Sequence, residues 1–498
     1  MIALTLPEIA AVVGGEVVDD PDGVVVRGAA SVDSREIEPD GLFAAFVGER
    51  SDGHDFAGAA VAAGAAAVLG SRATGHPTVL VEDPQAALGA LAHHVLGRLP
   101  DVTVLAVTGS QGKTSTKDLL AGVLAAHAET VATRGSFNNE LGLPLTVLRA
   151  GTGTRFLLLE MGARGIGHLR ELCAIARPDV SLVLNVGKAH LGEFGTQDDI
   201  ATAKGELVEA LTPDGVAVLN ADDPRVAAMA ARTAGRVVTF GTLGSTLPTD
   251  EVPTDVVAAA FARDAPTVGY ADVRLDAEGR PTFALVVEWR RVPVTLQLVG
   301  AHHVPNAAAA VAAAAAVGIG LEEAAASLAG VSTVSRWRME VARRADGVVV
   351  VNDAYNANPD SMRAALEALV SIGAGGSARR RVAVLGEMKE LGASADAEHA
   401  EVGRLARSLG VDVLLAVGEA ARPALTGFDA THGDDGEDGM AGQSDQVRAV
   451  AAADNEAAVR WLGEHLRADD VVLVKASRGA RLDEVAAALL ADDRGVGA

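Results

Sequence analysis

The stretch Val104-Leu-Ala-Val-Thr-Gly-Ser-Gln-Gly-Lys-Thr-Ser-Thr116 decides the fold class. An apolar, β-branched run leads into a glycine-rich turn, and an amphipathic helix is expected over 115–127, with the apolar positions between Leu119 and Leu124 on one face. Glycines let backbone N–H groups face inward, and the N-terminus of the helix adds partial positive charge. Strand, loop and helix in this order predict a phosphate-binding loop and a bound nucleoside triphosphate.

Individual residues of this loop have expected roles. Lys113 can reach the terminal phosphates, and Thr114 supplies a hydroxyl for Mg²⁺. Val107 replaces the first glycine of the general pattern, so Gly109 must make the turn. A glycine-rich turn with a chance Lys-Thr pair is the alternative, but the flanking strand and helix favour a nucleotide site. The expected ATP contacts are Thr108, Gly109, Ser110, Gln111, Gly112, Lys113, Thr114 and Ser115.

Composition excludes several classes of protein. The 498 residues carry 42 Lys and Arg against 66 Asp and Glu, a net charge of −24, which disfavours binding to nucleic acid or to anionic membranes. The single cysteine, Cys173, excludes a disulfide within the chain. No basic residue precedes Arg27, and the apolar run Ala307–Ala316 is too short to span a bilayer. We therefore expect a soluble, cytoplasmic protein without membrane insertion.

The apolar runs predict an α/β protein of about three domains. We expect a mixed α/β N-terminal domain over 1–100, a central P-loop domain with a parallel sheet over 101–330, and a C-terminal Rossmann-like domain over 331–498. Expected central strands are Val102–Val107, Phe156–Leu159, Val180–Val186, Val216–Leu219 and Val237–Phe240, and expected C-terminal strands are Val348–Val351, Val382–Leu385, Val413–Val417 and Val471–Val474.

Four other segments carry weaker patterns. We expect a helix over Ala57–Ala67 and an alanine-rich helix from Ala307. The interval 241–280 is expected to form a loop and an antiparallel hairpin. Residues 425–446 are rich in Gly and Asp and poor in large apolar side chains, so we expect a solvated, mobile insertion rather than a partner site.

Three polar residues follow predicted strands, at the edge where an open parallel sheet binds ligands. Glu160 ends one strand, His190 follows the next, and Lys204 lies in Ala203-Lys-Gly-Glu206. A carboxylate beside a phosphate loop can complete the oxygen shell of Mg²⁺. Taken singly, Glu160 could cap a helix, His190 could be structural and Lys204 could lie on the surface. Together with the loop they indicate a metal-assisted site.

At these residues the chain resembles the Mur ligases, ATP-dependent amide ligases of peptidoglycan-precursor synthesis, over nearly its whole length. In the first two domains the motifs are Ser31-Val-Asp-Ser-Arg35, Asp52-Gly-His-Asp-Phe56, Thr108–Thr114, Asn138-Asn-Glu-Leu-Gly-Leu-Pro144, Leu159-Glu-Met-Gly162, Asn185-Val-Gly-Lys-Ala-His190, Ala203–Glu206 and Gly300-Ala-His-His-Val-Pro-Asn-Ala307. In the last domain they are Arg338-Met-Glu340, Asn352-Asp-Ala-Tyr-Asn-Ala-Asn-Pro-Asp-Ser-Met362, Leu385-Gly-Glu-Met-Lys-Glu-Leu-Gly392 and Lys475-Ala-Ser-Arg478.

The resemblance implies the reaction. The segment Asp353-Ala-Tyr-Asn-Ala-Asn-Pro359 is similar to that of family members that attach D-alanyl-D-alanine to UDP-N-acetylmuramoyl-tripeptide. In such enzymes ATP phosphorylates the terminal carboxylate of the tripeptide, and the incoming amine attacks the acyl phosphate. Both steps develop negative charge, so cations and fixed hydrogen-bond donors should carry catalysis.

The resemblance also implies roles for the nucleotide and metal residues. Lys113, His190, Lys204 and Arg338 would be catalytic, with Arg338 reaching the γ-phosphate from across a domain cleft. Asn306 would contact adenine, and Asp353 the ribose or the adenine edge. Two Mg²⁺ ions are implied, one held by Thr114 and Glu160, the other by His190 and by Lys204 as a CO₂-derived carbamate. An unmodified Lys204 that contacts phosphate is the alternative.

Substrate contacts follow in the same way. Ser34 and Arg35 would contact the UDP end of the precursor, and Asn138 and Asn139 its muramyl-peptide part. Tyr355, Asn356 and Asn358 would form the dipeptide pocket, although Asn358-Pro359 also fits a helix start. The family usually has Asn directly after His302, where this chain has His303. We expect a monomer whose last two domains close around the nucleotide.

Three other functions fit part of the sequence. A folylpoly-γ-glutamate synthetase would share the phosphate loop and the lysine, but not a first domain with Asp33-Ser-Arg35. The ligase that adds the third peptide residue would share that domain, but usually carries Asp-Asn-Pro-Arg in place of Asn356-Ala-Asn-Pro359. A P-loop protein that uses ATP as a switch would not need Glu160, Lys204 and Arg338 together.

Overall fold

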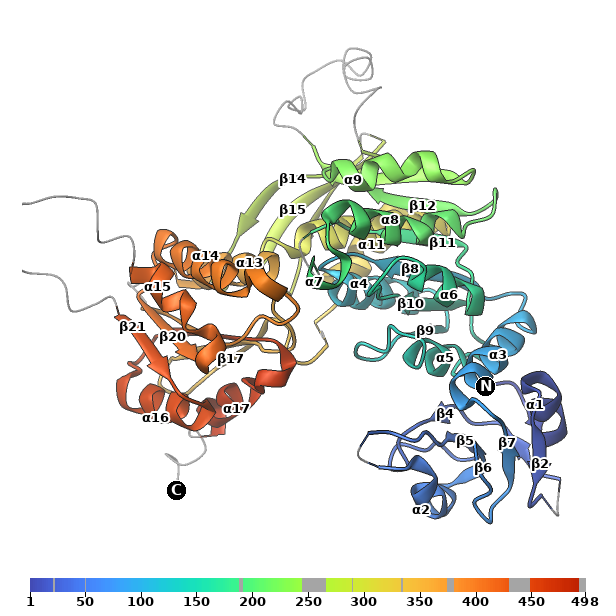
Figure 1. Cartoon of the computed structure of the whole chain (residues 1–498). Coiled ribbons are helices and arrows are strands. Elements are labelled where there is room, and N and C mark those ends of the chain that lie inside the picture. Colours follow the sequence, from blue (N-terminus) through green and yellow to red (C-terminus); the bar gives the residue numbers. More distant parts are fainter. Residues whose placement is uncertain are drawn as a thin grey trace, which may run out of the picture.

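The computed structural model describes residues 1–20, 23–49, 51–187, 191–243, 266–288, 290–332, 335–373, 380–429 and 448–491. Three α/β units follow one another along the chain, with sheets of five, nine and six strands (Figure 1). The predicted metal ligand His190 and most of the predicted insertion, from 430 to 446, lie outside the described residues. None of the helices in the described part of the chain is long and apolar enough to cross a membrane.

The N-terminal unit contains a five-stranded sheet in the order β2-β7-β6-β5-β4 and a separate pair of strands, β1 and β3. Its strands are β1 (Leu4–Thr5), β2 (Glu16–Val18), β3 (Val25–Val26), β4 (Ala30–Ser31), β5 (Gly41–Ala44), β6 (Ala65–Gly70) and β7 (Thr78–Leu80), and its helices are α1 (Leu6–Val13), α2 (Ala57–Ala63) and α3 (Pro84–Gly97). A helix was predicted over Ala57–Ala67, but α2 ends four residues earlier, at Ala63. Gly64, at φ 120°, ends α2, and Ala65 begins a buried strand.

The central unit is built on the strand order β16-β15-β14-β13-β12-β11-β8-β10-β9. Its strands are β8 (Thr103–Thr108), β9 (Thr130–Ala132), β10 (Phe156–Glu160), β11 (Val180–Val183), β12 (Val216–Asn220), β13 (Arg236–Thr242), β14 (Val268–Leu275), β15 (Pro281–Val287) and β16 (Arg290–Thr295). Its helices are α4 (Lys113–Ala125), α5 (Gly142–Val147), α6 (His168–Ile175), α7 (Leu191–Phe194), α8 (Gln197–Glu209), α9 (Pro224–Ala227), α11 (His303–Ala316) and α12 (Leu321–Ala329).

This sheet is parallel from β9 to β14, as predicted, and continues in antiparallel strands β15 and β16. The bounds predicted for the hairpin, within 241–280, were wrong, because the antiparallel strands extend from β14 to β16, over 268–295, and belong to the same sheet. Residues 244–265 of that interval lie outside the described residues. Pro293 lies in the edge strand β16, where a missing N–H is tolerated. The strand predicted over Val180–Val186 ends earlier, at Val183. As predicted, the apolar face of α4 is fully buried, and it packs against α11.

The C-terminal unit has the strand order β17-β18-β22-β19-β20-β21. Its strands are β17 (Glu340–Arg343), β18 (Val349–Asp353), β19 (Arg381–Leu385), β20 (Val413–Val417), β21 (Arg448–Ala452) and β22 (Val471–Lys475), and its helices are α13 (Pro359–Gly373), α14 (Ala395–Ser408), α15 (Pro423–Asp429), α16 (Asn455–His465) and α17 (Asp483–Ala491). Residues 425–429 of the predicted insertion belong to α15, where Gly427 and Phe428 are buried against α14. That part of the insertion prediction was wrong.

The central and C-terminal units are joined by specific contacts. Asp118 of α4 accepts hydrogen bonds from the backbone N and the Oγ of Ser335, both at 2.8 Å. The hydroxyls of Ser136 and Tyr355 also share a hydrogen bond, which ties the loop after β9 to the loop after β18. Together these contacts hold the carboxyl ends of two sheets around one cavity.

Candidate active site

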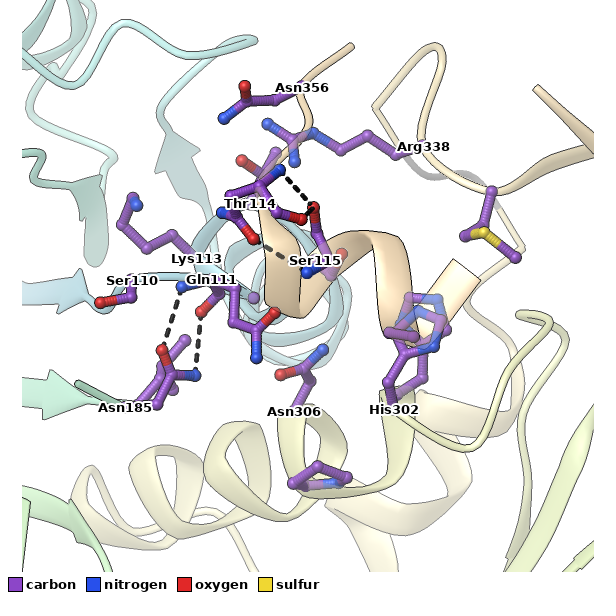
Figure 2. Close-up of a pocket in the computed structure, with 18 of the residues that line it drawn as sticks. Ser110, Gln111, Lys113, Thr114, Ser115, Asn185, His302, Asn306, Arg338 and Asn356 are labelled. Carbon is purple, nitrogen blue, oxygen red and sulfur yellow. Dashed lines mark hydrogen bonds between the residues drawn. The ribbon is translucent and has the colours of Figure 1, made fainter. Parts of the chain in front are cut away.

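A cavity of about 540 Å³ lies between the central and C-terminal units. Figure 2 shows the loop of Lys113 and Thr114 at its middle, Asn306 and His302 of α11 on one side, and Arg338 and Asn356 on the other. Most of the residues predicted to bind nucleotide, metal, precursor or dipeptide line it. They are Ser110, Gln111, Gly112, Lys113, Thr114, Ser115, Asn138, Glu160, Asn306, Arg338, Asp353, Tyr355, Asn356 and Asn358.

The phosphate loop is held in shape by Asn185, at the end of the neighbouring strand. Its Oδ1 accepts a hydrogen bond from the Gln111 N–H at 3.0 Å, and its Nδ2 donates to the Gln111 carbonyl at 3.2 Å (Figure 2). Gly187 N–H donates to Ser110 Oγ at 2.9 Å. Gly112 has φ 79°, which favours glycine, and it precedes the first residue of α4. Contacts within the protein therefore fix the shape of the loop.

Lys113 is folded back over this loop. Its Nζ donates to the Gly109 carbonyl at 2.7 Å. Burial lowers the pKa of the Lys113 ammonium, Glu160 opposes that effect, and Arg338 adds to it. The two cations are thus close enough to influence each other, although they belong to different domains. A polyphosphate between them would relieve their repulsion.

Glu160 is a buried carboxylate with one oxygen bonded and one not. Its Oε1 accepts from Asn138 Nδ2 at 2.8 Å, and its Oε2 has no hydrogen-bond partner among the described residues. Thr114 is also buried and lines the same cavity. A free carboxylate oxygen and a hydroxyl next to a phosphate loop are a donor set that suits Mg²⁺. Asn138, predicted to bind the precursor, lines the cavity and orients this carboxylate.

Lys204 lies on α8 with its side chain buried. Burial, and secondarily the charge of Lys113, lower the pKa of the Lys204 amine well below its usual range. Glu206, in the same motif, has a structural role, because it accepts from the backbone N–H groups of Gly167 and Arg170 at the start of α6. Within the described ranges, which exclude His190, no group of three or more acidic, histidine or cysteine side chains is arranged so that it could hold a metal ion.

The N-terminus of α11 places two histidines and Asn306 at the cavity. The Oδ1 of Asn306 lies 2.7 Å from the position that a Cβ would occupy on Gly112, so Asn306 contacts the phosphate loop closely. The rings of His302 and His303 are 4.2 Å apart. Burial lowers the pKa of His302 to about 4, with a smaller opposing effect from Asp353, and lowers that of His303 well below its usual range. Both imidazoles are therefore neutral at pH 7.

Asp353 joins three parts of the C-terminal unit. Its Oδ2 lies 2.5 Å from the Nζ of Lys475, which also donates to the Asn356 carbonyl at 2.9 Å. Its Oδ1 accepts from the backbone N–H of Met339 at 3.1 Å. This carboxylate, predicted to bind ribose or adenine, is thus already engaged by a buried lysine.

Arg338 projects into the cavity from a strained segment. The residues on either side of it, Trp337 and Met339, have φ values of 61° and 51°, in the left-handed region that side chains rarely adopt. The Arg338 guanidinium lies 4.4 Å from the centre of the Tyr355 ring, and its Nε has no hydrogen-bond partner among the described residues. Arg478 packs over Tyr355 at 5.5 Å and over Trp337 at 5.1 Å. The backbone and the rings together fix the direction of Arg338.

The other predicted residues lie elsewhere or serve the fold. Thr108 and Gly109 are at the base of the loop and do not line the cavity. Asn139 accepts from the Gly142 N–H at the start of α5. Ser34 and Arg35 follow β4 in the N-terminal unit, where Arg35 pairs with Asp33 and lowers the pKa of that carboxyl to about 2. Asn358 lines the cavity and also caps α13, since its Oδ1 accepts from Ser361 N–H at 2.8 Å.

Several cavity residues were not predicted. Asn220, Asp222, Phe240 and Tyr270 line it from the ends of β12, β13 and β14, and Lys475 lines it from β22. All five are at or near the ends of strands, as were the residues that the sequence singled out. Polar residues at strand ends were therefore the signal that could have found Asn220, Asp222 and Lys475.

Comparison with protein families matches most of the chain. The Mur ligase middle domain matches residues 107–314, the Mur ligase, glutamate ligase domain matches 337–478, and the Mur ligase family, catalytic domain matches 29–95. A UDP-N-acetylmuramoyl-tripeptide–D-alanyl-D-alanine ligase of Mycobacterium tuberculosis is 45% identical, with 99% of each chain covered. The Escherichia coli ligase of the same name is 32% identical, over 98% of this chain and 99% of its own.

Solved structures agree with these relatives. MurF from Acinetobacter baumannii superposes with a TM-score of 0.80 at 29% identity, covering 98% of this chain and 99% of its own. MurF ligase from Thermotoga maritima, solved in complex with ADP, gives a TM-score of 0.74 at 28% identity, covering 94% and 98%.

Proposed function

The chain belongs to the Mur ligase family, and we propose that the cavity between its central and C-terminal units is the active site. The reaction is the ATP-dependent ligation of D-alanyl-D-alanine to UDP-N-acetylmuramoyl-tripeptide in peptidoglycan synthesis, with release of ADP and phosphate. One observation carries the assignment of the site: the phosphate loop and Arg338, from different domains, face the same cavity.

ATP binds with its phosphates on the loop between β8 and α4. The loop N–H groups and Lys113 hold the phosphates, and Arg338 approaches the γ-phosphate from the C-terminal unit. An arginine suits this place because its charge is fixed and its fork can bind two phosphate oxygens. Asn306 and Asp353 lie where they can contact the nucleoside. Asp353 would do so through its two carboxylate oxygens, which also bind Lys475 Nζ and the Met339 N–H.

Glu160 and Thr114 would hold one Mg²⁺. When bound, the ion neutralises negative charge that develops on the transferred phosphoryl group. Asn138 keeps the carboxylate oriented through Oε1 and leaves Oε2 without a hydrogen-bond partner among the described residues. His190 and a carbamate on Lys204 would serve a second ion. CO₂ adds to a neutral amine, and the burial of Lys204 beside Lys113 favours that form.

The residues then act on two substrates in turn. The γ-phosphoryl group moves from ATP to the terminal carboxylate of the tripeptide, and ADP leaves. The amine of D-alanyl-D-alanine attacks the acyl carbon, the C–N bond forms, the amine loses a proton and the C–O bond to phosphate breaks. Lys113 and Arg338 stabilise negative charge in both steps. Tyr355, Asn356 and Asn358 border the side of the cavity from which the dipeptide would approach.

The rest of the molecule fits this proposal. Ser34 and Arg35 lie in the N-terminal unit, away from the cavity, as expected for contacts to the distant UDP end of a long precursor. The domain limits remain near residues 100 and 330. We propose a cytoplasmic protein, because ATP and nucleotide-linked precursors are cytoplasmic compounds, and we propose that it acts as a monomer.

The test is phosphate release from ATP and Mg²⁺ with UDP-N-acetylmuramoyl-tripeptide, with and without D-alanyl-D-alanine. We expect release to require both substrates and to give a product heavier by the dipeptide. Arg338→Lys should lose activity, whereas Arg407→Lys should not, although Arg407 also packs on an aromatic ring, that of Phe428. Release with a single amino acid in place of the dipeptide would contradict the substrate assignment.

The carbamate has its own experiment. Lys204→Ala should lose activity, and added short carboxylates should restore part of it, because their oxygens can replace those of a carbamate. Absence of rescue, together with an unmodified mass for Lys204 in the native protein, would contradict the carbamate and leave the rest of the site intact.

A further inference from the structure

His303 is a buried imidazole whose two nitrogens have no hydrogen-bond partner among the described residues. It is the first residue of α11, it is 2% exposed, and it borders the active-site cavity. The other buried histidines in the described part of the chain differ from it. His54 uses both nitrogens, with Asp52 and Ser71, and so does His399, with Ala395 and Met388.

An unbonded buried imidazole costs stability, because the nitrogens have lost water without gaining a protein partner. Such a group is explained when a ligand supplies the missing partner. His303 and Asn306 are three residues apart on α11 and so share a helix face. Asn306 touches the phosphate loop at Gly112. His303 therefore lies along the same wall, one helical turn from the point where a nucleotide would leave the loop.

The charge of His303 indicates which half of the nucleotide it meets. Burial keeps the ring neutral by lowering its pKa, and the adjacent His302 opposes protonation further. A neutral imidazole has one donor and one acceptor, whereas phosphate oxygens at neutral pH mainly accept. Ribose hydroxyls and the edges of a base offer both donors and acceptors, so they match the ring better than phosphate does.

We propose that His303 positions ATP by hydrogen bonding its nucleoside half through the imidazole nitrogens. The inference rests on the proposed function only in that ATP occupies this cavity. It assigns a role to the residue at which this chain departs from the usual family motif, and it adds a nucleotide contact to those of Asn306 and Asp353.

The test combines stability with ligand binding in the full-length protein. His303→Leu should unfold at a denaturant concentration no lower than the native protein without nucleotide, because no hydrogen bond is lost. Its Kd for ATP with Mg²⁺ should rise about tenfold, the usual effect of one lost hydrogen bond to a ligand. His303→Asn should bind more tightly than His303→Leu, since an amide keeps a donor and an acceptor. His54→Leu is the matched control, with lower stability and unchanged ATP affinity.

Three ligands locate the contact. Inorganic tripolyphosphate should bind the native protein and His303→Leu equally. A loss of affinity for ATP but not for 2′,3′-dideoxyATP places the contact at the ribose, and an equal loss for both places it at the base; either result supports the proposal. Unchanged ATP affinity, or an equal loss for tripolyphosphate, would overturn it. If the native protein bound no ATP, the proposed function itself would fail.

Discussion

The buried ion pair of Lys475 and Asp353 makes a quantitative prediction. Lys475 is 2% exposed, and its Nζ lies 2.5 Å from Asp353 Oδ2. Removing one partner of a buried pair costs about 3–5 kcal/mol, because the other charge stays buried without compensation. Asp353 keeps 14% of its side chain exposed, so Lys475→Met should cost about 3 kcal/mol, near the lower end. Asp353→Asn leaves the charge of Lys475, the more buried partner, without compensation, so it should lower the free energy of unfolding by more than Lys475→Met does.

The double variant Asp353→Asn with Lys475→Met should be more stable than either single variant. It removes both charges, and the asparagine Oδ1 can still accept from the Met339 N–H. We expect a coupling free energy of at least about 2 kcal/mol between the two positions. The lost bond from Lys475 to the Asn356 carbonyl leaves a remaining cost of about 1 kcal/mol.

Denaturant unfolding followed by tryptophan fluorescence measures these changes. Of the three tryptophans in the sequence, Trp337 and Trp461 belong to the C-terminal unit, so the signal reports mainly on the domain that holds the pair. Since a multidomain chain need not unfold in one step, the transition should be assigned on the native protein first. The reasoning would be refuted if the stability lost in the double variant equalled the sum of the losses in the two single variants. A loss below about 1 kcal/mol for Lys475→Met would also refute it.

Three further predictions concern the cavity. His302 has a pKa of about 4 in the folded protein, below its usual 6.5, so the unfolded chain binds more protons in this range. The free energy of unfolding should therefore decrease as the pH is lowered from 6.5 to 4, by at most about 3 kcal/mol. Unfolding measured at pH 7 and pH 5 should differ less in His302→Gln than in the native protein. Glu160→Gln should keep the bond from Asn138 and the fold, but weaken activation of phosphate release by Mg²⁺ at least tenfold, roughly the effect of losing a metal-orienting group. Tyr355→Phe keeps the ring under Arg338 but loses the hydrogen bond to Ser136. The closed arrangement of the central and C-terminal units should lose about 1 kcal/mol of stability. Small-angle scattering with ATP should then show a more open molecule.

The sequence predicted the buried strands well because they are short β-branched runs between polar or glycine residues. β10 and β12 each extend one residue beyond their predicted ranges, and β8 is shifted by one residue from its predicted range. Three strands of the last two units, β9, β17 and β21, were not predicted. Of these, β21 is Arg-Ala-Val-Ala-Ala at the sheet edge, with only its last residue buried, so its sequence has no apolar periodicity. At Ala65–Ala67 alanine suited a helix, but Gly64 ends α2 and the tertiary structure uses these residues in a strand.

The site was predictable where its pattern is local. The loop from Ser110 to Ser115 needs only adjacent residues, and the structure places all six around the cavity. The pairing of Lys475 with Asp353 joins residues 122 positions apart, and no spacing rule could reveal it. The bond from Asn138 to Glu160 could not be predicted for the same reason, because it depends on how β10 packs beside the loop after β9.

Asp353 links these observations into one structural argument. The same carboxylate neutralises Lys475, which holds the loop of Asn356, and accepts from Met339, whose left-handed backbone helps to aim Arg338. Tyr355 N–H also donates to the Trp337 carbonyl on the other side of Arg338. The direction of the arginine and the shape of the dipeptide side are therefore set by one network. A change at Asp353 should alter both nucleotide and dipeptide use, whereas a change at Asn306, on the opposite wall, should affect the nucleotide alone.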